Sequence, residues 1–484
     1  MIKISNIRLG KATNSSSTHS MIFLPNHNEE DYEVEDGDFG WNYFTAASQE
    51  TKNLYFYVLV KESLNSILKN QKYTNIILKE LFSLDLPKDK DQSYIDHQSH
   101  IRLPANWDGT GINEQFAKEL YDFISRPDIL ILGGNDNTDK VHPLIKDKKS
   151  KEIDIHKLLI DFDTYRYSNQ LVARKDGDWW VFFNRTTGAK IRFSFNSSSN
   201  NDYKHSTFPE LVDIKITNFC NENCPYCYQD SNVNGSHAEC MYIYDIIQLL
   251  EEMQVFEVAI GGGEPTAHPL FLPILQRFRN EGIVPNFSTR SLAWLYDNEL
   301  WPKILELCGG FAFSARSVKE VSKLGLLMSD GRSELYDKKA HIHYVMGTLK
   351  PWDFSRLLEE AYKWRMPVTL LGYKETGRGS NYTPNDYSNW VKQCSILCEE
   401  RKLPKLNIDT SLAKDFQEEL EAQGVPPYMY TIKEGAFSMY IDAVDGTYGP
   451  SSFCNPKNML KLPKIRYIDN TKALEEIKKQ YAKF

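Results

Sequence analysis

The chain has 484 residues, of which 41% are hydrophobic and 13% aromatic, enough for a sizeable core and about three domains. This composition excludes a disordered chain, a collagen and a small disulfide-stabilised scaffold. Lys and Arg number 57 against 65 Asp and Glu, and the formal net charge of -8 disfavours a protein whose whole surface attracts nucleic acid. A local basic groove stays compatible with this balance.

The chain begins MIKISNIRLGKATNSSS, which lacks the charged start and apolar stretch of a secretory signal. No run of about 18 or more apolar residues is present, so we expect no membrane span. Both observations predict a soluble, cytoplasmic protein. In a reducing compartment, the eight cysteines favour metal or redox chemistry over disulfide bonds.

Residues 1–204 predict an independent α+β domain without a recognisable catalytic constellation; its role would be to bind a substrate or a partner. The expected elements are a strand at Leu54–Val60, a helix at Glu114–Ile124, and a hairpin of Trp179–Phe183 and Ala189–Phe195, with polar loops at 14–20 and 196–201. Residues 106–111 (NWDGTG) resemble a recurrent bacterial segment, and the simpler alternative is a turn that caps the following helix.

Residues 205–380 alternate between short strand-like runs and helical stretches. Strands are expected at 211–217, 255–261, 283–289, 310–316, 341–347 and 367–373, and helices at 241–253, 270–281, 295–307, 317–327 and 351–364. Six strands with right-handed helical crossovers form a parallel sheet, so the predicted fold class is α/β, a partial (β/α)6 barrel. Function in such folds lies at the carboxyl ends of the strands.

Three of the eight cysteines form a CxxxCxxC segment at Cys220, Cys224 and Cys227, directly after the first expected strand. A structural zinc site would need a fourth close ligand, usually in paired CxxC units, and the sequence has no second CxxC. Three thiolates on one loop suit a four-iron cluster with one iron left open to a ligand.

This spacing, with the aromatic Tyr226 before the last cysteine, resembles the radical SAM superfamily. Gly261-Gly262-Gly263-Glu264-Pro265 follows the second strand and is similar to that superfamily's segment for the methionine amino group of S-adenosylmethionine, where Glu264 would balance the ammonium. The resemblance implies one 4Fe-4S cluster, S-adenosylmethionine and a flavodoxin- or ferredoxin-type reductant. It also implies reductive cleavage to a 5'-deoxyadenosyl radical that removes hydrogen from a substrate.

Alternation along the strands predicts which side chains face the barrel interior. In 341–347 the apolar set is Ile342, Tyr344 and Met346, which turns His341, His343 and Val345 inward. The same reasoning turns inward Asp213, Lys215, Thr217, Glu257, Asn286, Ser288, Arg290, Ser314 and Arg316. Such a polar interior is either paired internally, for example Lys215 with Glu257, or awaits a polar ligand.

By the resemblance, Ser288, Ser314 and Arg316 stand where the superfamily binds the ribose hydroxyls and the methionine carboxylate. Arg290, His343 and Tyr373 would face the second substrate. Arg378, between Gly377 and Gly379, is a further candidate that would clamp a carboxylate or phosphate, and the alternative for it is a solvated loop arginine.

Residues 381–484 predict a small α+β extension, with helices at 386–402 and 411–421, a strand at 405–409 and a hairpin of 437–444 and 447–451. The hairpin is similar to the SPASM and twitch extensions of radical SAM enzymes that act on peptides and proteins. Where those extensions carry cysteines for auxiliary clusters, this chain has Ser411, Ile432, Lys433 and Ser451, and only Cys454 lies nearby. We therefore expect no auxiliary cluster; Cys394 and Cys398 are interpreted as helix packing.

The leading hypothesis is a radical SAM enzyme that modifies a peptide or protein side chain. A rival within enzymes acts on a nucleoside, nucleotide or nucleic-acid base, with Arg378 on a phosphate, although the net acidity disfavours a long nucleic acid. The non-enzymatic rival keeps an iron–sulfur cluster for structure or sensing, which leaves Glu264 without an explanation.

Overall fold

The computed structural model divides the chain into two compact units, Met1–Tyr203 and Lys204–Phe484. In the first unit it describes residues 3–8, 20–24, 27–32, 34, 38–39, 44–68, 76, 78–80, 83–84, 94–95, 103–106, 111–133, 151–153, 170–195 and 203. In the second unit it describes all residues except 330–338, 427–429 and 466–469. Within the described parts, no helix combines the length and the apolar character that a membrane crossing needs.

The first unit contains α-helices and mainly antiparallel sheets. One sheet has the order β1(Lys3–Arg8), β10(Lys190–Ser194), β9(Trp179–Asn184), β8(Leu171–Asp176), so the predicted hairpin is present as β9 and β10. A second sheet has the order β4(Phe44–Ala46), β6(Ile129–Gly133), β2(Ser20–Phe23), β7(Lys151–Ile153), and β3(Asp38–Phe39) pairs with β5(Tyr94–Ile95). The helix α3 spans Glu114–Ile124 as predicted, and Asn113 caps it by accepting from the backbone N–H of Phe116. The expected loops at 14–20 and 196–201 and most of the NWDGTG segment lie outside the described residues.

The strand expected at Leu54–Val60 is wrong, because these residues lie in the middle of the helix α1(Gln49–Leu68). Every side chain from Leu54 to Val60 is buried, so the helix is covered on all sides along this stretch. A continuous apolar run has neither the alternation of a half-buried strand nor the stripe of an amphipathic helix. The pattern of the run could therefore not distinguish the two structures.

A ten-stranded sheet organises the second unit. Its order is β17(Leu406–Ile408), β16(Val368–Leu371), β15(Ala340–Val345), β14(Phe311–Ser314), β13(Val284–Thr289), β12(Glu257–Gly262), β11(Leu211–Thr217), β18(Ser438–Asp442), β19(Thr447–Gly449), β20(Leu460–Lys461). The strands from β11 to β16 are parallel and lie side by side in chain order, which confirms the predicted α/β class. Their six carboxyl ends therefore meet at one edge of the sheet.

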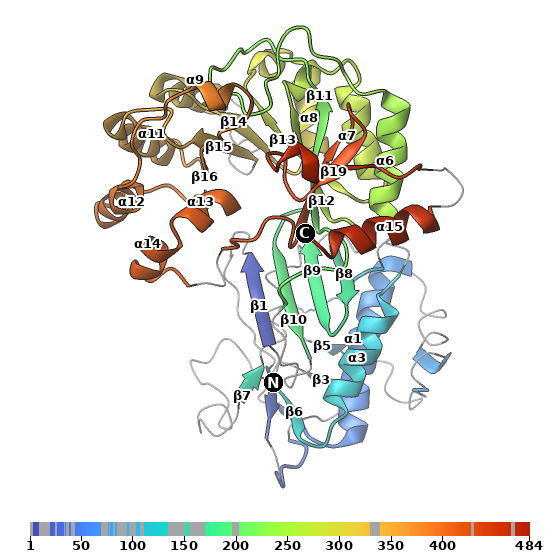
Figure 1. Cartoon of the computed structure of the whole chain (residues 1–484). Helices are drawn as coiled ribbons and strands as arrows, with labels where there is room; N and C mark the ends of the chain where they lie inside the picture. The colour runs from blue at the N-terminus through green and yellow to red at the C-terminus, as the bar shows by residue number, and fades with distance from the viewer. Residues whose placement is uncertain are drawn as a thin grey trace. The chain divides into compact units, whose positions relative to one another are not determined.

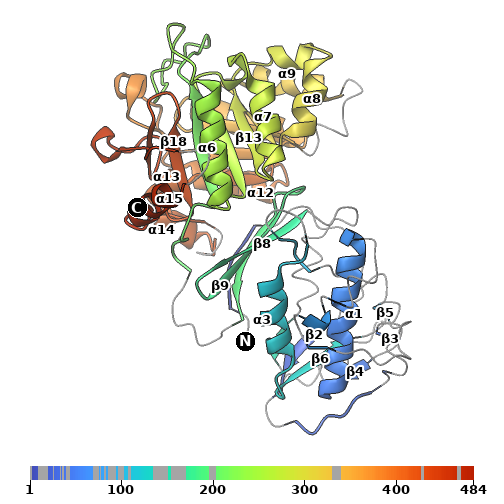
Figure 2. The same cartoon turned by 90° about the vertical axis from the view of Figure 1, so that its right-hand side faces the viewer.

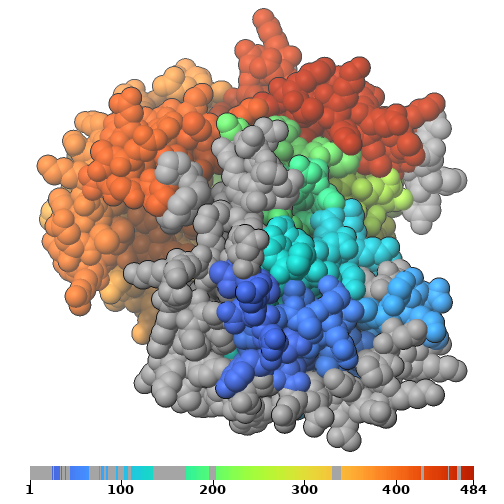
Figure 3. Space-filling model, turned by 90° about the horizontal axis from the view of Figure 1, so that it is seen from below, coloured from blue at the N-terminus to red at the C-terminus, as the bar shows by residue number. Residues whose placement is uncertain are grey.

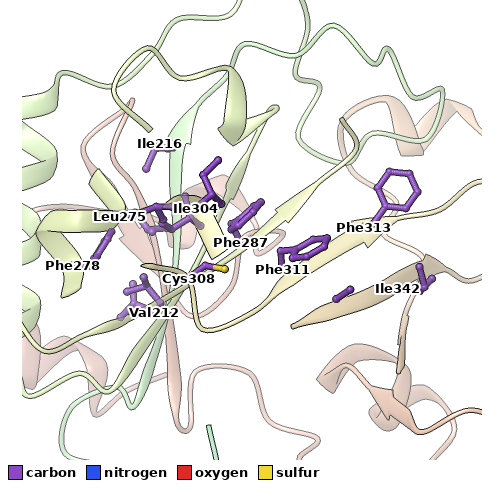
Figure 4. Close-up of a cluster of buried hydrophobic side chains, with 14 of the residues drawn as sticks. Val212, Ile216, Leu275, Phe278, Phe287, Ile304, Cys308, Phe311, Phe313 and Ile342 are labelled. Carbon is purple, nitrogen blue, oxygen red and sulfur yellow. The ribbon is translucent and has the colours of Figure 1, made fainter. Parts of the chain in front are cut away.

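Helices on one face of this sheet cover its apolar side (Figures 1 and 2). They are α6(Cys240–Glu252), α7(Phe271–Asn280), α8(Leu300–Leu307), α9(Val318–Ser329) and α11(Pro351–Lys363). Figure 4 shows the packed layer between helices and strands, where Phe287 and Phe311 stack with ring centroids 5.8 Å apart. Cys308 is fully buried in this layer. The opposite face of the strands is thereby left to the polar side chains.

The segment after residue 380 joins both edges of the parallel strands. β17 extends the sheet beyond β16, whereas β18 pairs in parallel with β11 and β19 pairs antiparallel with β18, as the predicted hairpin requires. The helix expected at 411–421 is interrupted at Phe416 into α13(Thr410–Asp415) and α14(Gln417–Ala422), and α12 spans Trp390–Glu399. These segments appear in orange and red in the surface view of Figure 3. The domain boundaries at 204 and 380 stay predictions.

Candidate functional site

The cysteine segment is a loop that leaves the carboxyl end of β11. Its backbone folds on itself: the N–H of Cys227 donates to the carbonyl of Cys224 at 3.2 Å, and that of Cys220 donates to Asn232 O at 2.9 Å. All three cysteines are free thiols and partly exposed. Burial raises the pKa of the Cys220 and Cys224 thiols, and nearby Arg316 opposes that rise at Cys224. The loop therefore presents three unpaired sulfur atoms at the edge where the strands end.

The glycine-rich segment lies directly against the beginning of this loop. The N–H of Gly263 donates to Thr217 O at 2.7 Å, and the N–H of Glu264 donates to Phe219 O at 2.8 Å. A Cβ on Gly263 would lie 2.0 Å from Phe219 O, and Gly262 has a φ of +110°. Only glycine fits both positions, because a side chain would collide with backbone or adopt a strained conformation.

Glu264 holds the ends of β12 and β13 together. One carboxylate oxygen accepts from the hydroxyls of Thr266 (2.6 Å) and Thr289 (2.7 Å), and the other accepts from the N–H groups of Arg290 (2.8 Å) and Ser291 (3.1 Å). The side chain is buried. These donors engage both oxygens, so Glu264 fixes the shape of the segment; its expected contact with an ammonium stays a prediction.

A group of charged side chains surrounds Cys224. Arg316 Nη1 lies 3.9 Å from Cys224 Sγ, and Arg316 Nη2 lies 3.8 Å from a carboxylate oxygen of Glu222. The backbone N–H of Arg316 donates to Glu320 at 2.6 Å. The side chain of Arg316 is about one-third exposed, and its Nε lies 3.9 Å from Glu320 Oε1. The expected contact of Arg316 with the methionine carboxylate stays a prediction.

Arg290, expected to face the second substrate, has acidic partners within the chain. Its guanidinium makes a bidentate ion pair with Glu320, at 2.8 and 3.0 Å, and also donates to the backbone carbonyl of Ser314. It packs over the ring of Phe313 at 5.4 Å. Arg290 therefore links the carboxyl ends of β13 and β14 to the start of α9, and Glu320 is a site residue that sequence analysis missed.

Arg378 also differs from both interpretations of the sequence. Its guanidinium donates to Cys224 O (3.0 Å), to Asp230 Oδ1 (2.7 Å) and to Ser231 O (2.9 Å), and its N–H donates to Cys227 O (2.9 Å). It is thus neither a solvated loop arginine nor a free anion clamp. Arg378, in the segment after β16, therefore binds the cysteine loop that follows β11.

Two tyrosines among the predicted site residues, Tyr373 and Tyr226, contact other parts of the chain. The Tyr373 hydroxyl donates to Gly379 O at 2.6 Å, so it holds the turn that carries Arg378. The Tyr226 ring meets Tyr382 edge-on with centroids 5.5 Å apart, and burial raises the pKa of Tyr226. Ser314 and Ser288 lie at the ends of neighbouring strands, where their partly exposed side chains stay compatible with a cofactor role.

The alternation predicted for β15 is present: Ile342 and Tyr344 are fully buried, and His341 and His343 alternate with them at partly exposed positions. Ser288 Oγ lies 3.4 Å from Nδ1 of His343. Burial, His341 and Lys374 together lower the pKa of His343 to about 4, and Asp409 opposes this effect. The imidazole is therefore neutral at pH 7.

This pKa predicts a pH dependence of folding. An unfolded histidine titrates near 6.5, so between about pH 6.5 and pH 4 the unfolded chain binds more protons at His343 than the folded chain. The neutral His343 of the folded chain therefore contributes its full stability above pH 6.5. This contribution is lost as the pH falls from 6.5 to about 4, because the unfolded chain gains the proton first. The free energy of unfolding of wild type should decrease more between pH 7 and pH 5 than that of His343→Gln. Equal decreases would contradict this assignment.

Lys374 is a buried cation that sequence analysis did not single out. Its Nζ lies 3.4 Å from Asp409 Oδ2 and over the rings of Tyr228 (5.2 Å) and Phe453 (4.3 Å). Lys215, expected to pair with Glu257, instead pairs with Asp442 of β18 at 2.8 Å. Both ion pairs include a residue from the C-terminal segment, so the predicted internal pairing is present with different partners.

Residues 214–325, which include the cysteine loop and the glycine-rich segment, match the family model of the radical SAM superfamily. The match shows a radical SAM segment in this part of the chain. Among curated proteins, this chain is 37% identical over 88 residues to the mycofactocin maturase MftC of Mycobacterium ulcerans. It is 25% identical over 148 residues to the tungsten-containing aldehyde ferredoxin oxidoreductase cofactor-modifying protein of Pyrococcus furiosus.

These matches are partial. The first covers 17% of this chain and 23% of the maturase, and the second covers 28% of this chain and 40% of the Pyrococcus protein. Among solved structures, Streptococcus suis SuiB bound to S-adenosylmethionine aligns with a TM-score of 0.46 at 13% identity. That alignment covers 60% of this chain and 84% of SuiB.

Radical SAM proteins use a 4Fe-4S cluster and S-adenosylmethionine, and the site fits both. Cys220, Cys224 and Cys227 supply three thiols for the cluster, and soft thiolates suit iron–sulfur clusters. Gly261 has open space where a Cβ would stand, so a ligand can approach the backbone there. Among the described residues, no group of three or more His, Cys, Asp or Glu could hold a single metal ion. An iron–sulfur cluster does not need ligands that converge on a single ion, because each cysteine binds its own iron.

Proposed function

We propose that this protein is a radical SAM enzyme that removes a hydrogen atom from a side chain of a peptide or protein. The observation that carries the proposal is the joining of two motifs by two backbone hydrogen bonds, Gly263 N–H to Thr217 O and Glu264 N–H to Phe219 O. These bonds hold the cysteine loop and the glycine-rich segment next to each other at the edge where the strands end.

When bound, the cluster and S-adenosylmethionine supply a 5'-deoxyadenosyl radical. The residues of this chain then have distinct tasks. The cysteines bind iron, Gly261 leaves open space in which the methionine end can approach the backbone, and Arg316 offers a partly exposed guanidinium to a carboxylate. Gly262 and Gly263 allow the segment to pack against the backbone of Thr217 and Phe219. Glu264 and Arg378 position the two segments.

The substrate class rests on two supports. The C-terminal hairpin is present as β18 and β19. Its sequence is similar to the SPASM and twitch extensions of radical SAM enzymes that act on peptides and proteins. One relative is a maturase by name. The nucleotide alternative relied on Arg378 as a phosphate ligand, and the bonds of Arg378 to Cys224 O, Asp230 and Ser231 O occupy that guanidinium.

The test is an anaerobic turnover with the reconstituted full chain, dithionite and S-adenosylmethionine. We expect about four irons per chain and formation of 5'-deoxyadenosine. Cys224→Ser should reduce cleavage by about 100-fold or more, because it removes an iron ligand. Cys398→Ser, at an exposed position on α12, is the matched control and should retain both iron and cleavage.

Substrate class is tested in the same reaction by tandem mass spectrometry of candidate peptides. A mass change localised to one side chain supports the proposal. Cleavage of S-adenosylmethionine accompanied by modification of a nucleoside and of no peptide would replace it with the nucleotide alternative. Absence of cleavage with a full iron content would favour the non-enzymatic role.

A further inference from the structure

A cavity of about 230 Å³ opens beside the ends of β16 and β17. Its lining residues are Tyr373, Lys374, Thr410, Ser411, Lys414, Asp415, Ile432, Glu434 and Phe453. They come from three separate parts of the chain: the loop after β16, the helix α13, and the residues that flank the C-terminal hairpin. Ser411 and Ile432 stand at two of the positions where SPASM extensions carry cysteines and where we expect no auxiliary cluster in this chain.

The cavity adjoins the cysteine loop. Its wall residue Lys374 lies over the ring of Tyr228, at 5.2 Å, and Tyr228 directly follows Cys227 in the chain. Thr376 donates to Tyr228 O at 3.1 Å, which holds the two loops together. A group in this cavity would therefore lie close to the segment that holds the cofactors.

The charges of the lining favour a cation. Lys374 is already balanced by Asp409, at 3.4 Å, and by two aromatic faces. The remaining charged groups of the lining are two acids, Asp415 and Glu434, against one lysine, Lys414. Burial and the nearby acids raise the pKa of Glu434 to about 7, and burial raises that of Asp213 to about 6. Burial is the main cause of both shifts and Lys374 opposes both, so a further ammonium beside Glu434 would favour its ionised form.

We propose that this cavity binds an alkylammonium group of the substrate, with Glu434 as its counter-ion and with Ile432 and Phe453 along its methylene groups. This assignment rests on the proposed function, because it names the chemistry that the peptide substrate carries. A lysine side chain and a peptide amino terminus share this chemistry. The aliphatic and aromatic walls suit an alkyl chain that ends in a charge.

Ligand-observed NMR titrations of the reconstituted full chain at pH 8 test the proposal, since Glu434 is ionised there. The probes are n-butylammonium, glycinamide and the anionic isostere butyrate. We expect n-butylammonium or glycinamide to bind and butyrate not to bind. Tighter binding of n-butylammonium indicates a side-chain amine, and tighter binding of glycinamide indicates an amino terminus.

Two charge variants should act in opposite directions. Glu434→Gln should weaken ammonium binding by about tenfold, whereas Lys414→Gln should strengthen it by about twofold, because it removes a repelling charge. Glu419→Gln, at an exposed acid on α14, is the matched control and should bind as wild type does. Lys414→Gln keeps the test valid if Glu434→Gln fails to fold.

Preference for butyrate, no binding of either amine, or equal affinity of Glu434→Gln and Glu419→Gln would overturn the assignment. The proposed function is judged separately, by formation of 5'-deoxyadenosine in wild type without any probe. Amine binding by a protein that cleaves no S-adenosylmethionine would retain the cavity assignment and reject the enzyme. Cleavage of S-adenosylmethionine without amine binding would retain the enzyme and reject the cavity assignment.

Discussion

Gly263→Ala is expected to destabilise the protein by about 2 to 4 kcal/mol and to reduce cleavage of S-adenosylmethionine by about 100-fold. The added methyl carbon would lie 2.0 Å from Phe219 O and 2.6 Å from Phe219 C. These atoms belong to the backbone of the loop that leads to Cys220, so they cannot move away as a flexible side chain could. The two hydrogen bonds that join the motifs would have to lengthen.

Gly261→Ala is the matched control for stability, because the same carbon at Gly261 would meet nothing within 4 Å. We expect its free energy of unfolding to stay within about 1 kcal/mol of wild type. Denaturant unfolding of the iron-free proteins measures the clash alone, and anaerobic cleavage assays measure its effect on the site. Equal stability of the two alanine variants would show that the close approach to Phe219 is relaxed in solution.

Those features of the site that depend on local pattern could be predicted from the sequence. Apolar runs separated by helical stretches indicated the strand order, and the spacing of Cys220, Cys224 and Cys227 indicated the cluster loop. The inward direction of His343 followed from strict alternation along β15. In each case the information lies within a few neighbouring residues.

Roles that depend on distant partners could not be predicted in this way. Arg290 looked available for a substrate, but its counter-ion Glu320 lies 30 residues further along the chain. Lys374 passed unnoticed, because its partner Asp409 and the ring of Phe453 come from later segments. The helix at Leu54–Val60 was misassigned because a segment that is buried on all sides has no periodic pattern.

Arg378→Met is expected to reduce the iron content after reconstitution from about four to less than about two per chain. The guanidinium donates to three acceptors on the cysteine loop, which are Cys224 O, Asp230 Oδ1 and Ser231 O. Asp230 has a positive φ of 54°, a conformation that side-chain-bearing residues seldom adopt. Without the guanidinium, the loop loses the side-chain bonds at Cys224 O, Asp230 and Ser231 O, and only backbone bonds remain at Cys224 and Cys227.

The same contacts exist without iron, so the iron-free variant should also unfold more easily, by about 2 kcal/mol. Arg378→Lys should give an intermediate result, because an ammonium cannot reach three separated acceptors as a planar guanidinium does. Arg356→Met, an exposed arginine on α11 that is 3.9 Å from Asp353, serves as the control. Unfolding curves, iron assays and the EPR spectrum of the reduced cluster report separately on fold, loading and cluster environment. Full loading and an unchanged spectrum in Arg378→Met would show that the loop holds its shape without this residue.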